Sequence, residues 1–354
     1  MITQAEKTVN NNNCKSGGGN RNLGIDILRI ICAFFVVCIH KPLTGSGAWI
    51  FMSVVNIAVP CFFMITGYYY TNIEKNHRQA AQLKKTVLIT VAATAIYVIY
   101  DIIKAGNLAA YITKYISVSS MKLLLLINIP ITQSGHHLWY LYAMIYVLVI
   151  VYVIRKINKT KLLYALTPIL CIMCIFLQTY INAFTDKTVY IIYSRNFLFT
   201  GLPCFAIGML IHEKRDIIAS RLSDKLNVTL IAVLAVLNAI EYYCLLNKNI
   251  DTNMYFMTIP LSVAVFIYFT LKLKTENKTA AVLSNMGRRY SMYVYIIHLL
   301  VMDVLNNLIG QNSVYVRIAP VFVFLTALII SAAVAYTEQQ CKRVRRKNEL
   351  RIDK

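Results

Sequence analysis

The sequence predicts an all-α, polytopic membrane protein with about ten transmembrane helices. Of its 354 residues, 58% are hydrophobic and only 14% are charged, whereas a soluble domain is about half apolar and about a quarter charged. The mean hydropathy is +0.58, and the apolar residues fall in runs close to the roughly 20 residues that a helix needs to cross a bilayer. Composition therefore excludes a soluble globule, a disordered chain, a collagen and a coiled coil.

Ten apolar runs follow a polar N-terminal tail, which covers residues 1–22. The tail is rich in Asn and Gly and lacks the apolar core of a signal peptide, so we expect it to be disordered. The runs lie near residues 24–44, 48–70, 84–104, 136–154, 161–181, 196–212, 226–246, 253–271, 290–310 and 314–336. A further run at 123–130 is too short to span and is expected to lie in the membrane interface or to re-enter. We expect one transmembrane domain over 23–338 and a basic cytoplasmic tail over 339–354.

The orientation follows from the basic residues, because cytoplasmic loops carry an excess of Lys and Arg. If the N-terminus is inside, 27 of the 36 Lys and Arg residues lie in the two tails and in the loops at 71–86, 155–161, 212–225 and 272–289. Both termini are therefore expected to be cytoplasmic. The net charge of +21 then reflects loop retention and contact with anionic lipid, and nucleic acid is not an expected partner.

The nine cysteines predict neither a disulfide framework nor a metal site. Most of them fall inside apolar runs, and no paired extracellular spacing occurs. Cys171 and Cys174 form a C-x-x-C pattern, but it lies in an apolar helix without a second pair of ligands. The chain also has no Gly-rich phosphate loop, no Gly-x-Ser-x-Gly elbow and no His-x-x-x-His pair, so hydrolase and ATPase functions have no support.

The first apolar run contains three ionisable residues, Asp26, Arg29 and His40. Such residues are costly inside a membrane and are functional candidates by default. Arg29 and His40 lie about 20° from three full helical turns apart, so they share a face and stand roughly 16 Å apart along the axis. This face suits a tunnel in which arginine holds an anionic donor and neutral imidazole takes a proton from a hydroxyl. Alternatively, Asp26 and Arg29 neutralise each other while Arg29 snorkels to the inner interface, and the spacing leaves both interpretations open.

Five segments, in order along the chain, match the motifs of one family. The first is Arg29 followed by ten residues and His40, after Asp26. The others are Val-Pro-Cys-Phe-Phe-Met-Ile-Thr-Gly-Tyr at 59–68, His-Leu-Trp-Tyr-Leu at 137–141, Arg195-Asn-Phe leading to Gly208, and Ser-Met-Tyr-Val-Tyr-Ile-Ile-His at 291–298. Together they resemble the acyltransferase 3 family of polytopic membrane acyltransferases over residues 23 to about 340, with Thr66 where the family has Ser.

Within that family, the sequence is most similar to the membrane half of the membrane-bound serine racemases of vancomycin resistance. The similarity is clearest at 59–69, 137–141 and 195–208. The chain stops after the tenth run, so we expect no racemase domain, and neither racemisation nor pyridoxal phosphate is implied.

The resemblance implies a membrane-embedded O-acyltransferase. Family members take acyl groups from cytoplasmic acyl-CoA and acylate a sugar or another hydroxyl at or beyond the outer face. His40 is thus implied as the base on the acceptor hydroxyl, and Arg29 as a residue that helps to hold the donor. We expect acyl-CoA as co-substrate, an acetyl group, an envelope glycan or similar acceptor, no tightly bound cofactor, no metal, and a multi-pass location in a bacterial plasma membrane.

Six more residues are expected to contact the acyl donor or the acceptor: Asp26, His137, Trp139, Arg195, Tyr295 and His298. Each has a structural alternative. His137, beside Trp139, can belong to an interfacial aromatic belt, and His298 can be a packing residue satisfied through Tyr295 one turn away. An outward arginine such as Arg195 suggests an acceptor contact, because positive charge is otherwise concentrated inside.

The remaining titratable residues carry weaker expectations. His136 is set aside because it faces away from its neighbour His137, and His77 and His212 fall in charged loops where we expect them to be solvated. Glu241 and Asp303 are both possible partners of His40, and the sequence does not choose between them.

Two rival functions stay open. The serine racemase relatives are thought to deliver L-serine through this same domain, so the chain can be an amino-acid permease. It can also be a catalytically silent membrane sensor or scaffold.

Overall fold

The computed structural model describes residues 22–115, 117–181, 195–250, 253–273, 277–310 and 312–352, and all regular structure in these residues is helical. The α-helices are α1 (Leu23–His40), α2 (Ala48–Val54), α3 (Ala58–Lys75), α4 (Gln79–Ala105), α5 (Leu108–Tyr115), α6 (Val118–Ile127), α7 (Trp139–Lys156), α8 (Thr160–Ile175), α10 (Leu202–Glu213), α11 (Arg215–Arg221), α12 (Asp224–Asn247), α13 (Thr258–Ile267), α14 (Lys278–Ile309) and α15 (Ser313–Ile352). Short 3-10 helices occur at η1 (Val55–Ile57) and η2 (His136–Leu138), and π-helical turns at η3 (Phe176–Tyr180), η5 (Phe197–Gly201) and η6 (Tyr268–Lys272). The predicted all-α class is confirmed.

Both predicted tails only partly coincide with the described residues. The N-terminal tail lies outside them except for Asn22, whose side chain caps α1 by accepting the N–H of Ile25 at 3.0 Å. At the other end, α15 continues as one helix through the expected domain boundary at residue 338 and reaches Ile352.

Eight helical segments of the described chain are long and apolar enough to cross a bilayer. They are Leu23–His40, Ala48–Lys75, Gln79–Ala105, His136–Lys156, Thr160–Tyr180, Asp224–Asn247, Lys278–Ile309 and Ser313–Arg343. Each overlaps one of the ten predicted runs, as expected for a multi-pass membrane protein. The short run at 123–130 overlaps α6, which at ten residues is too short to span.

The other two predicted runs form helices shorter than a full span, Phe197–Glu213 and Thr258–Lys272. The first of these includes α10, which is buried along most of its length and packs against α3 and α8. A helix enclosed by other helices is not required to match the thickness of the lipid, because its backbone and side chains meet protein instead. Among the described residues, eight of the ten predicted runs are thus helices of full-span length, and the other two are shorter helices.

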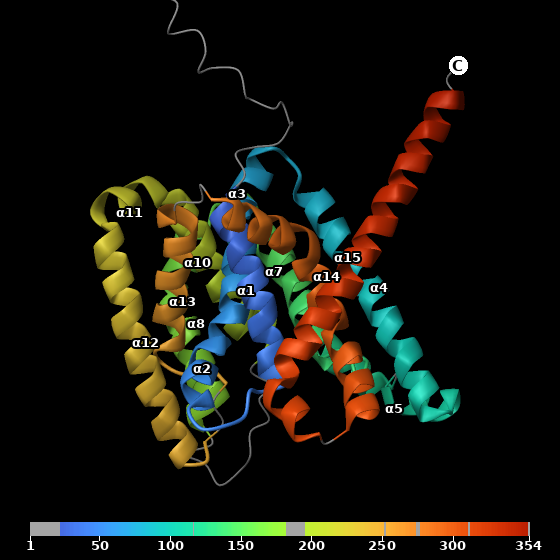
Figure 1. Ribbon diagram of the computed structural model, residues 1–354. Coiled ribbons are helices and arrows are strands. Elements are labelled where there is room, and N and C mark those ends of the chain that lie inside the picture. Colours follow the sequence, from blue (N-terminus) through green and yellow to red (C-terminus); the bar gives the residue numbers. More distant parts are fainter. Residues whose placement is uncertain are drawn as a thin grey trace, which may run out of the picture.

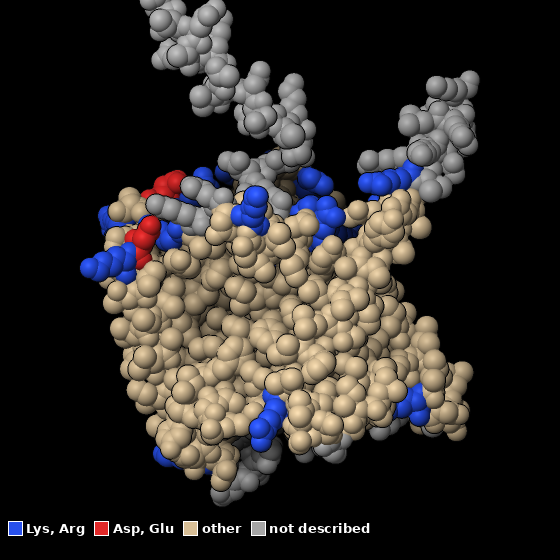
Figure 2. All heavy atoms as spheres, in the orientation of Figure 1, with Lys and Arg blue, Asp and Glu red and all other residues tan. Residues whose placement is uncertain are grey.

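Charge divides the surface into two ends and an uncharged band. Figure 2 shows Lys and Arg gathered at the upper end of the molecule and few at the lower end. Large apolar side chains are exposed between the ends, among them Ile103 on α4, Val236 on α12 and Ile329 on α15. Such a surface suits contact with hydrocarbon rather than water. We call the end where α3, α7 and α10 finish the basic end, and the end where α1 finishes at His40 the histidine end.

Close helix crossings depend on glycines. α1 lies inside the bundle against α3, α14 and α15 (Figure 1), and a Cβ on Gly287 of α14 would lie 1.7 Å from the carbonyl oxygen of Asp26. α3 and α10 approach each other in the same way, since a Cβ on Gly208 would lie 2.1 Å from the carbonyl oxygen of Met64. Small residues let membrane helices approach this closely, because lipid supplies no hydrophobic force to drive them together.

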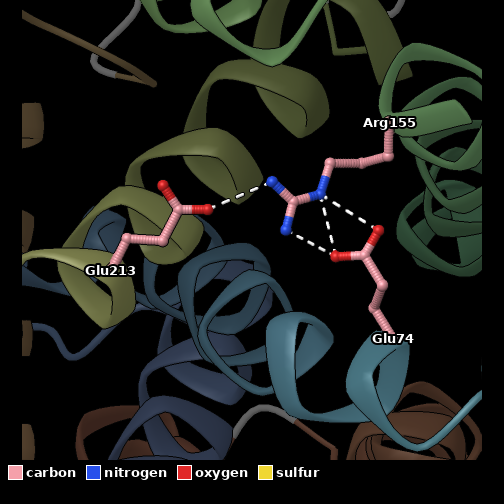
Figure 3. Close-up of polar contacts among 3 residues, drawn as sticks. All are labelled: Glu74, Arg155 and Glu213. Carbon is pink, nitrogen blue, oxygen red and sulfur yellow. Dashed lines mark hydrogen bonds and ion pairs between the residues drawn. The ribbon is translucent and has the colours of Figure 1, made fainter. Parts of the chain in front are cut away.

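An ion-pair cluster joins three helices at the basic end. Figure 3 shows Arg155, near the end of α7, between Glu74 of α3 and Glu213 of α10. Arg155 donates to Glu74 at 2.5 Å from Nη2 and at 2.9 Å from Nε, and its Nη1 lies 3.2 Å from Glu213. One guanidinium thereby fixes the ends of two helices relative to its own.

Candidate functional site

A pocket opens beside the last turn of α1, at the histidine end. It encloses about 620 Å³ of empty space, part of which is open to the outside. Its lining combines aromatic and polar side chains from several helices: Val36, Ile39, His40, Asn56, Val59, Phe62, His137, Trp139, Tyr140, Gln178, Arg195, Thr200, Asn253, Met254 and Tyr295. A concave site with apolar walls and a few convergent polar groups is typical of small-molecule binding.

Four histidines meet next to this pocket. The ring centre of His40 lies 5.2 Å from that of His136, 6.2 Å from that of His137 and 5.2 Å from that of His298. His137 and His298 are 4.8 Å apart and almost completely buried, whereas His40 is half-buried and His136 is exposed. The structure thus brings together the predicted residues His40, His137 and His298. It also corrects the expectation for His136, because the turn of η2 lets both of its histidines reach the ring of His40.

Hydrogen bonds to carbonyl oxygens fix the orientation of the two buried rings. His298 Nδ1 lies 2.8 Å from the carbonyl oxygen of Tyr295, and His137 Nε2 lies 3.2 Å from that of Ile296. A carbonyl oxygen only accepts, so each of these nitrogens carries the proton in the neutral ring. The other nitrogens, His298 Nε2 and His137 Nδ1, are buried and have no hydrogen-bond partner among the residues that the structure describes. Each ring therefore presents an unused lone pair.

The turn that carries the two consecutive histidines is held by Asp101, on α4. This buried carboxylate accepts the hydroxyl of Thr132 at 2.6 Å and the backbone N–H groups of Gln133 at 2.8 Å and Ser134 at 3.2 Å. The adjoining helix is locked to α14, because the hydroxyl of Tyr295 donates to the carbonyl oxygen of His137. Asp101 is not among the predicted site residues, although an acidic residue inside an apolar run was the available signal.

Arg195 also lines the pocket. Its guanidinium donates to the side-chain oxygen of Asn253, and both residues line the pocket. The next residue, Asn196, accepts the N–H groups of Leu198 and Phe199, each at 2.9 Å, and so caps η5. The predicted site residue Arg195 is thus placed in the same pocket as His40, at the start of a helical segment.

The inner pair of predicted residues lies elsewhere along α1. Asp26 is buried and accepts a hydrogen bond of 2.8 Å from Arg29 Nη1, and the Arg29 guanidinium lies 5.5 Å from the centre of the Tyr69 ring. Mutual neutralisation, one of the two interpretations of the spacing, is therefore present in the structure. On α1 the pocket lining reaches back from His40 to Val36, and Arg29 lies about 10 Å further along the helix.

A cluster of aromatic rings forms part of the pocket wall. Phe62, Tyr140 and Tyr295 all line the pocket, and the ring of Tyr140 lies 6.0 Å from that of Phe62 and 5.5 Å from that of Tyr295. Phe63 adds a fourth ring, 4.7 Å from Tyr140. We refer to Phe62, Phe63, Tyr140 and Tyr295 as the aromatic wall.

The carboxylates considered as partners of His40 are bonded to other groups. Glu241 accepts the Tyr180 hydroxyl and the backbone N–H of Met257, and Asp303 accepts from Tyr100 and pairs with Lys104 at 2.8 Å. Neither carboxylate is hydrogen-bonded to His40 in the described part of the chain.

Two further expectations concern metals and loop histidines. Within the described ranges, no group of three or more His, Cys, Asp or Glu side chains is arranged to hold a metal ion. His77 is exposed as expected. His212, expected to be solvated, is instead buried at the end of α10, where its ring packs against Tyr68.

Comparison with known proteins adds two findings. A family model described as an acyltransferase domain matches residues 22–337. A protein of Enterococcus faecalis named amino-acid racemase is 31% identical over 215 residues, a stretch that covers 54% of this chain and 28% of that protein. The chain thus spans less than a third of the length of this relative. No solved structure matches.

Proposed function

Because the chain belongs to the acyltransferase 3 family, we propose that it moves an acyl group, specifically acetyl, from cytoplasmic acyl-CoA to a hydroxyl of an envelope sugar or similar acceptor. The observation that carries the proposal is the half-buried His40 on the wall of a pocket at the histidine end. The proposed location is a bacterial plasma membrane, with the basic end in the cytoplasm.

In the proposed reaction, His40 acts as the general base. It takes the proton of the acceptor hydroxyl while the hydroxyl oxygen attacks the thioester carbonyl carbon. The carbon–sulfur bond then breaks, and the departing thiolate takes the proton from His40. The products are an ester and coenzyme A with a free thiol, and the histidine returns to its neutral form.

The other pocket residues are proposed to hold the acceptor. The lone pair on His137 Nδ1 is suited to accept a hydrogen bond from a second hydroxyl of a sugar, because it is buried and has no partner in the described part of the chain. Trp139 supplies an aromatic surface, and Arg195 supplies N–H donors for acceptor oxygens. A polyhydroxylated acceptor matches this mixture of donors, acceptors and rings.

The direct test is turnover of acetyl-CoA by the purified protein in detergent, scanned over envelope sugars and glycans as acceptors. We expect release of free thiol only when a suitable hydroxyl acceptor is present. Thiol release that is independent of every acceptor, or none at all, would count against the proposal.

Arg29 gives a second test, because donor phosphates need fixed positive charge near the basic end. Its side chain is 28% exposed, so we propose that it binds the donor while Asp26 orients it. Arg29→Ala is expected to weaken acetyl-CoA binding strongly, and Arg29→Lys to restore it only in part, since lysine lacks the bidentate fork. Arg78→Ala, an exposed arginine at the same end, is the matched control in calorimetric titration.

The relative named amino-acid racemase favours one alternative, an L-serine uptake domain. A permease would not bind coenzyme A, and labelled serine would accumulate in proteoliposomes. Serine flux without acetyl-CoA binding by the wild type would replace the acyltransferase proposal with this one.

A further inference from the structure

We propose that His298 is the positioning residue for His40, whose ring N–H it accepts so that the other nitrogen of His40 faces the pocket. The inference rests on the proposed function insofar as His40 is the base. Three features of the structure support it: the orientation of the His298 ring, the distance between the two rings, and the bonding of Glu241 and Asp303 to other groups.

The orientation of His298 is fixed by the backbone of its own helix. Its Nδ1–H donates to the carbonyl oxygen of Tyr295 at 2.8 Å, so in the neutral ring the lone pair lies on Nε2. This nitrogen is buried and has no partner among the described residues, and the residue is only 1% exposed. A buried acceptor without a donor costs about 1–3 kcal/mol, which favours any arrangement that supplies one.

His40 is placed to supply that donor. The ring centres of His40 and His298 are 5.2 Å apart, and two imidazoles joined by an N–H···N bond of about 3 Å have ring centres about 5 Å apart. The two rings are in contact, without a hydrogen bond between them in this structure. Catalytic hydrogen bonds are often long without substrate and shorten in the complex, so a small rotation of the half-buried His40 ring is sufficient.

The other neighbours of His40 are less suited to this role. The His137 ring centre is further away, at 6.2 Å, and the residue itself lines the pocket. His136 has the same ring distance as His298, 5.2 Å, but it is exposed, so water competes for its nitrogens. In Ser-His-Asp sites a buried carboxylate fixes the tautomer of the base. Here Glu241 and Asp303 are bonded elsewhere, and the neutral imidazole of His298 takes that position.

The chemical consequence is one of orientation rather than proton transfer. With its N–H directed at His298, His40 presents a lone pair to the acceptor hydroxyl and takes the hydroxyl proton there. His298 keeps one proton, on Nδ1, through the whole cycle. Loss of His298 should therefore lower kcat and leave the binding of acceptor and donor unchanged.

The first experiment compares kcat and KM for three variants. His298→Leu is expected to lower kcat about 10- to 100-fold, less than full loss of the base, with KM for the acceptor unchanged. His298→Gln should recover part of the rate, because its amide oxygen can accept the same N–H. His136→Leu, at the same ring distance from His40, is the matched control and should retain wild-type kcat. Equal losses for the His136 and His298 variants, or a rise in KM alone, would overturn the proposal.

The second experiment does not depend on acyl transfer. Diethyl pyrocarbonate acylates an imidazole through its lone pair, and peptide mass spectrometry gives the rate at His40. We expect fast modification in the wild type and in His298→Gln, and slow modification in His298→Leu, with His136→Leu unchanged. If His298→Leu does not fold, the shorter amide of His298→Asn takes its place. Identical rates in all variants would overturn the positioning role, whereas the expected pattern in a protein without acetyl-CoA turnover would overturn only the proposed function.

Discussion

His40 faces the pocket, as a base must, and the packing of α1 depends little on its side chain. It is the last residue of α1 and is half-buried on the wall of a pocket. Its neighbours Cys38 and Val37 are buried and pack the helix, so the end of α1 is held without the imidazole.

We therefore predict that His40→Ala abolishes acyl transfer while the protein still inserts and folds. Loss of a general base costs about 10²- to 10⁴-fold in rate. His137→Ala should be milder, because that residue is proposed only to contact the acceptor. Turnover in detergent measures acyl transfer, and a melting curve measures whether the protein folds. Near wild-type turnover of His40→Ala would show that the residue is structural.

Asp101 supports the site from outside it. Asp101→Ala removes the acceptor for one hydroxyl and two backbone N–H groups of the turn at 132–134. Hydrogen bonds to a charged group contribute about 1.5–3 kcal/mol each, so the variant should melt at a lower temperature and lose turnover as His137 shifts away from the acceptor. Asp303→Ala, which removes a half-buried carboxylate that does not bond to the turn, is the control. A wild-type melting temperature for Asp101→Ala would show that the turn at 132–134 is stable without the Asp101 carboxylate.

At the scale of residues, the sequence identifies single site residues better than it predicts which of them lie close together. His40, His137, His298 and Arg195 were each identifiable, because ionisable residues in apolar runs are unusual. Their convergence depends on contacts between residues more than 90 positions apart, which periodicity does not encode. The sequence does not predict that His136 reaches His40, because the 3-10 turn that brings both histidines to His40 has no distinct pattern.

At the scale of elements, hydrophobic runs predicted where helices occur but not how closely they pack. Eight of the runs became full-length spans, and the two that did not are the runs containing α10 and α13. The length of an apolar run does not show whether a helix is surrounded by protein or by lipid, because both environments require apolar side chains. The sequence also does not predict the glycine contacts between α3 and α10, because a glycine in an apolar run does not reveal which helix it faces.

We predict that Gly208→Ala separates α3 from α10. The new Cβ would lie 2.1 Å from the carbonyl oxygen of Met64, and backbone cannot yield as a flexible side chain can. Overpacking costs about 1–3 kcal/mol, so the melting temperature in detergent should fall. Ala95→Leu, on the exposed face of α4, adds more volume where there is room and should have no effect. An unchanged melting temperature for Gly208→Ala would show that the two helices slide apart freely.

At the scale of the whole molecule, the asymmetry of charge predicts the orientation in the membrane. Lys159 and Lys248 lie at opposite ends of the bundle and are exposed. Of the described cysteines only Cys244 and Cys341 are exposed, so replacing these two and Cys14 with serine gives a background with little reactivity.

In that background we predict that an impermeant thiol reagent on intact cells labels Lys248→Cys strongly and Lys159→Cys weakly. The reason is that the basic end is expected to face the cytoplasm. Labelling of both positions after permeabilisation is the control for access. Strong labelling at position 159 on intact cells would reverse the orientation.

The aromatic wall has an electrical consequence. A wet passage along α1 from Arg29 to His40 would let protons flow down the membrane potential, which is worth about 2.3 kcal/mol per charge for each 100 mV. Phe62 and Tyr140 line the pocket with their ring centres 6.0 Å apart, and a constriction of closely spaced rings blocks conduction by excluding water. Liposomes that contain the wild type should therefore hold a proton gradient, followed with an internal pH dye. Liposomes that contain the double variant Phe62→Ala with Tyr140→Ala should lose the proton gradient. If the double variant holds the gradient as well as the wild type does, other residues block the passage of protons.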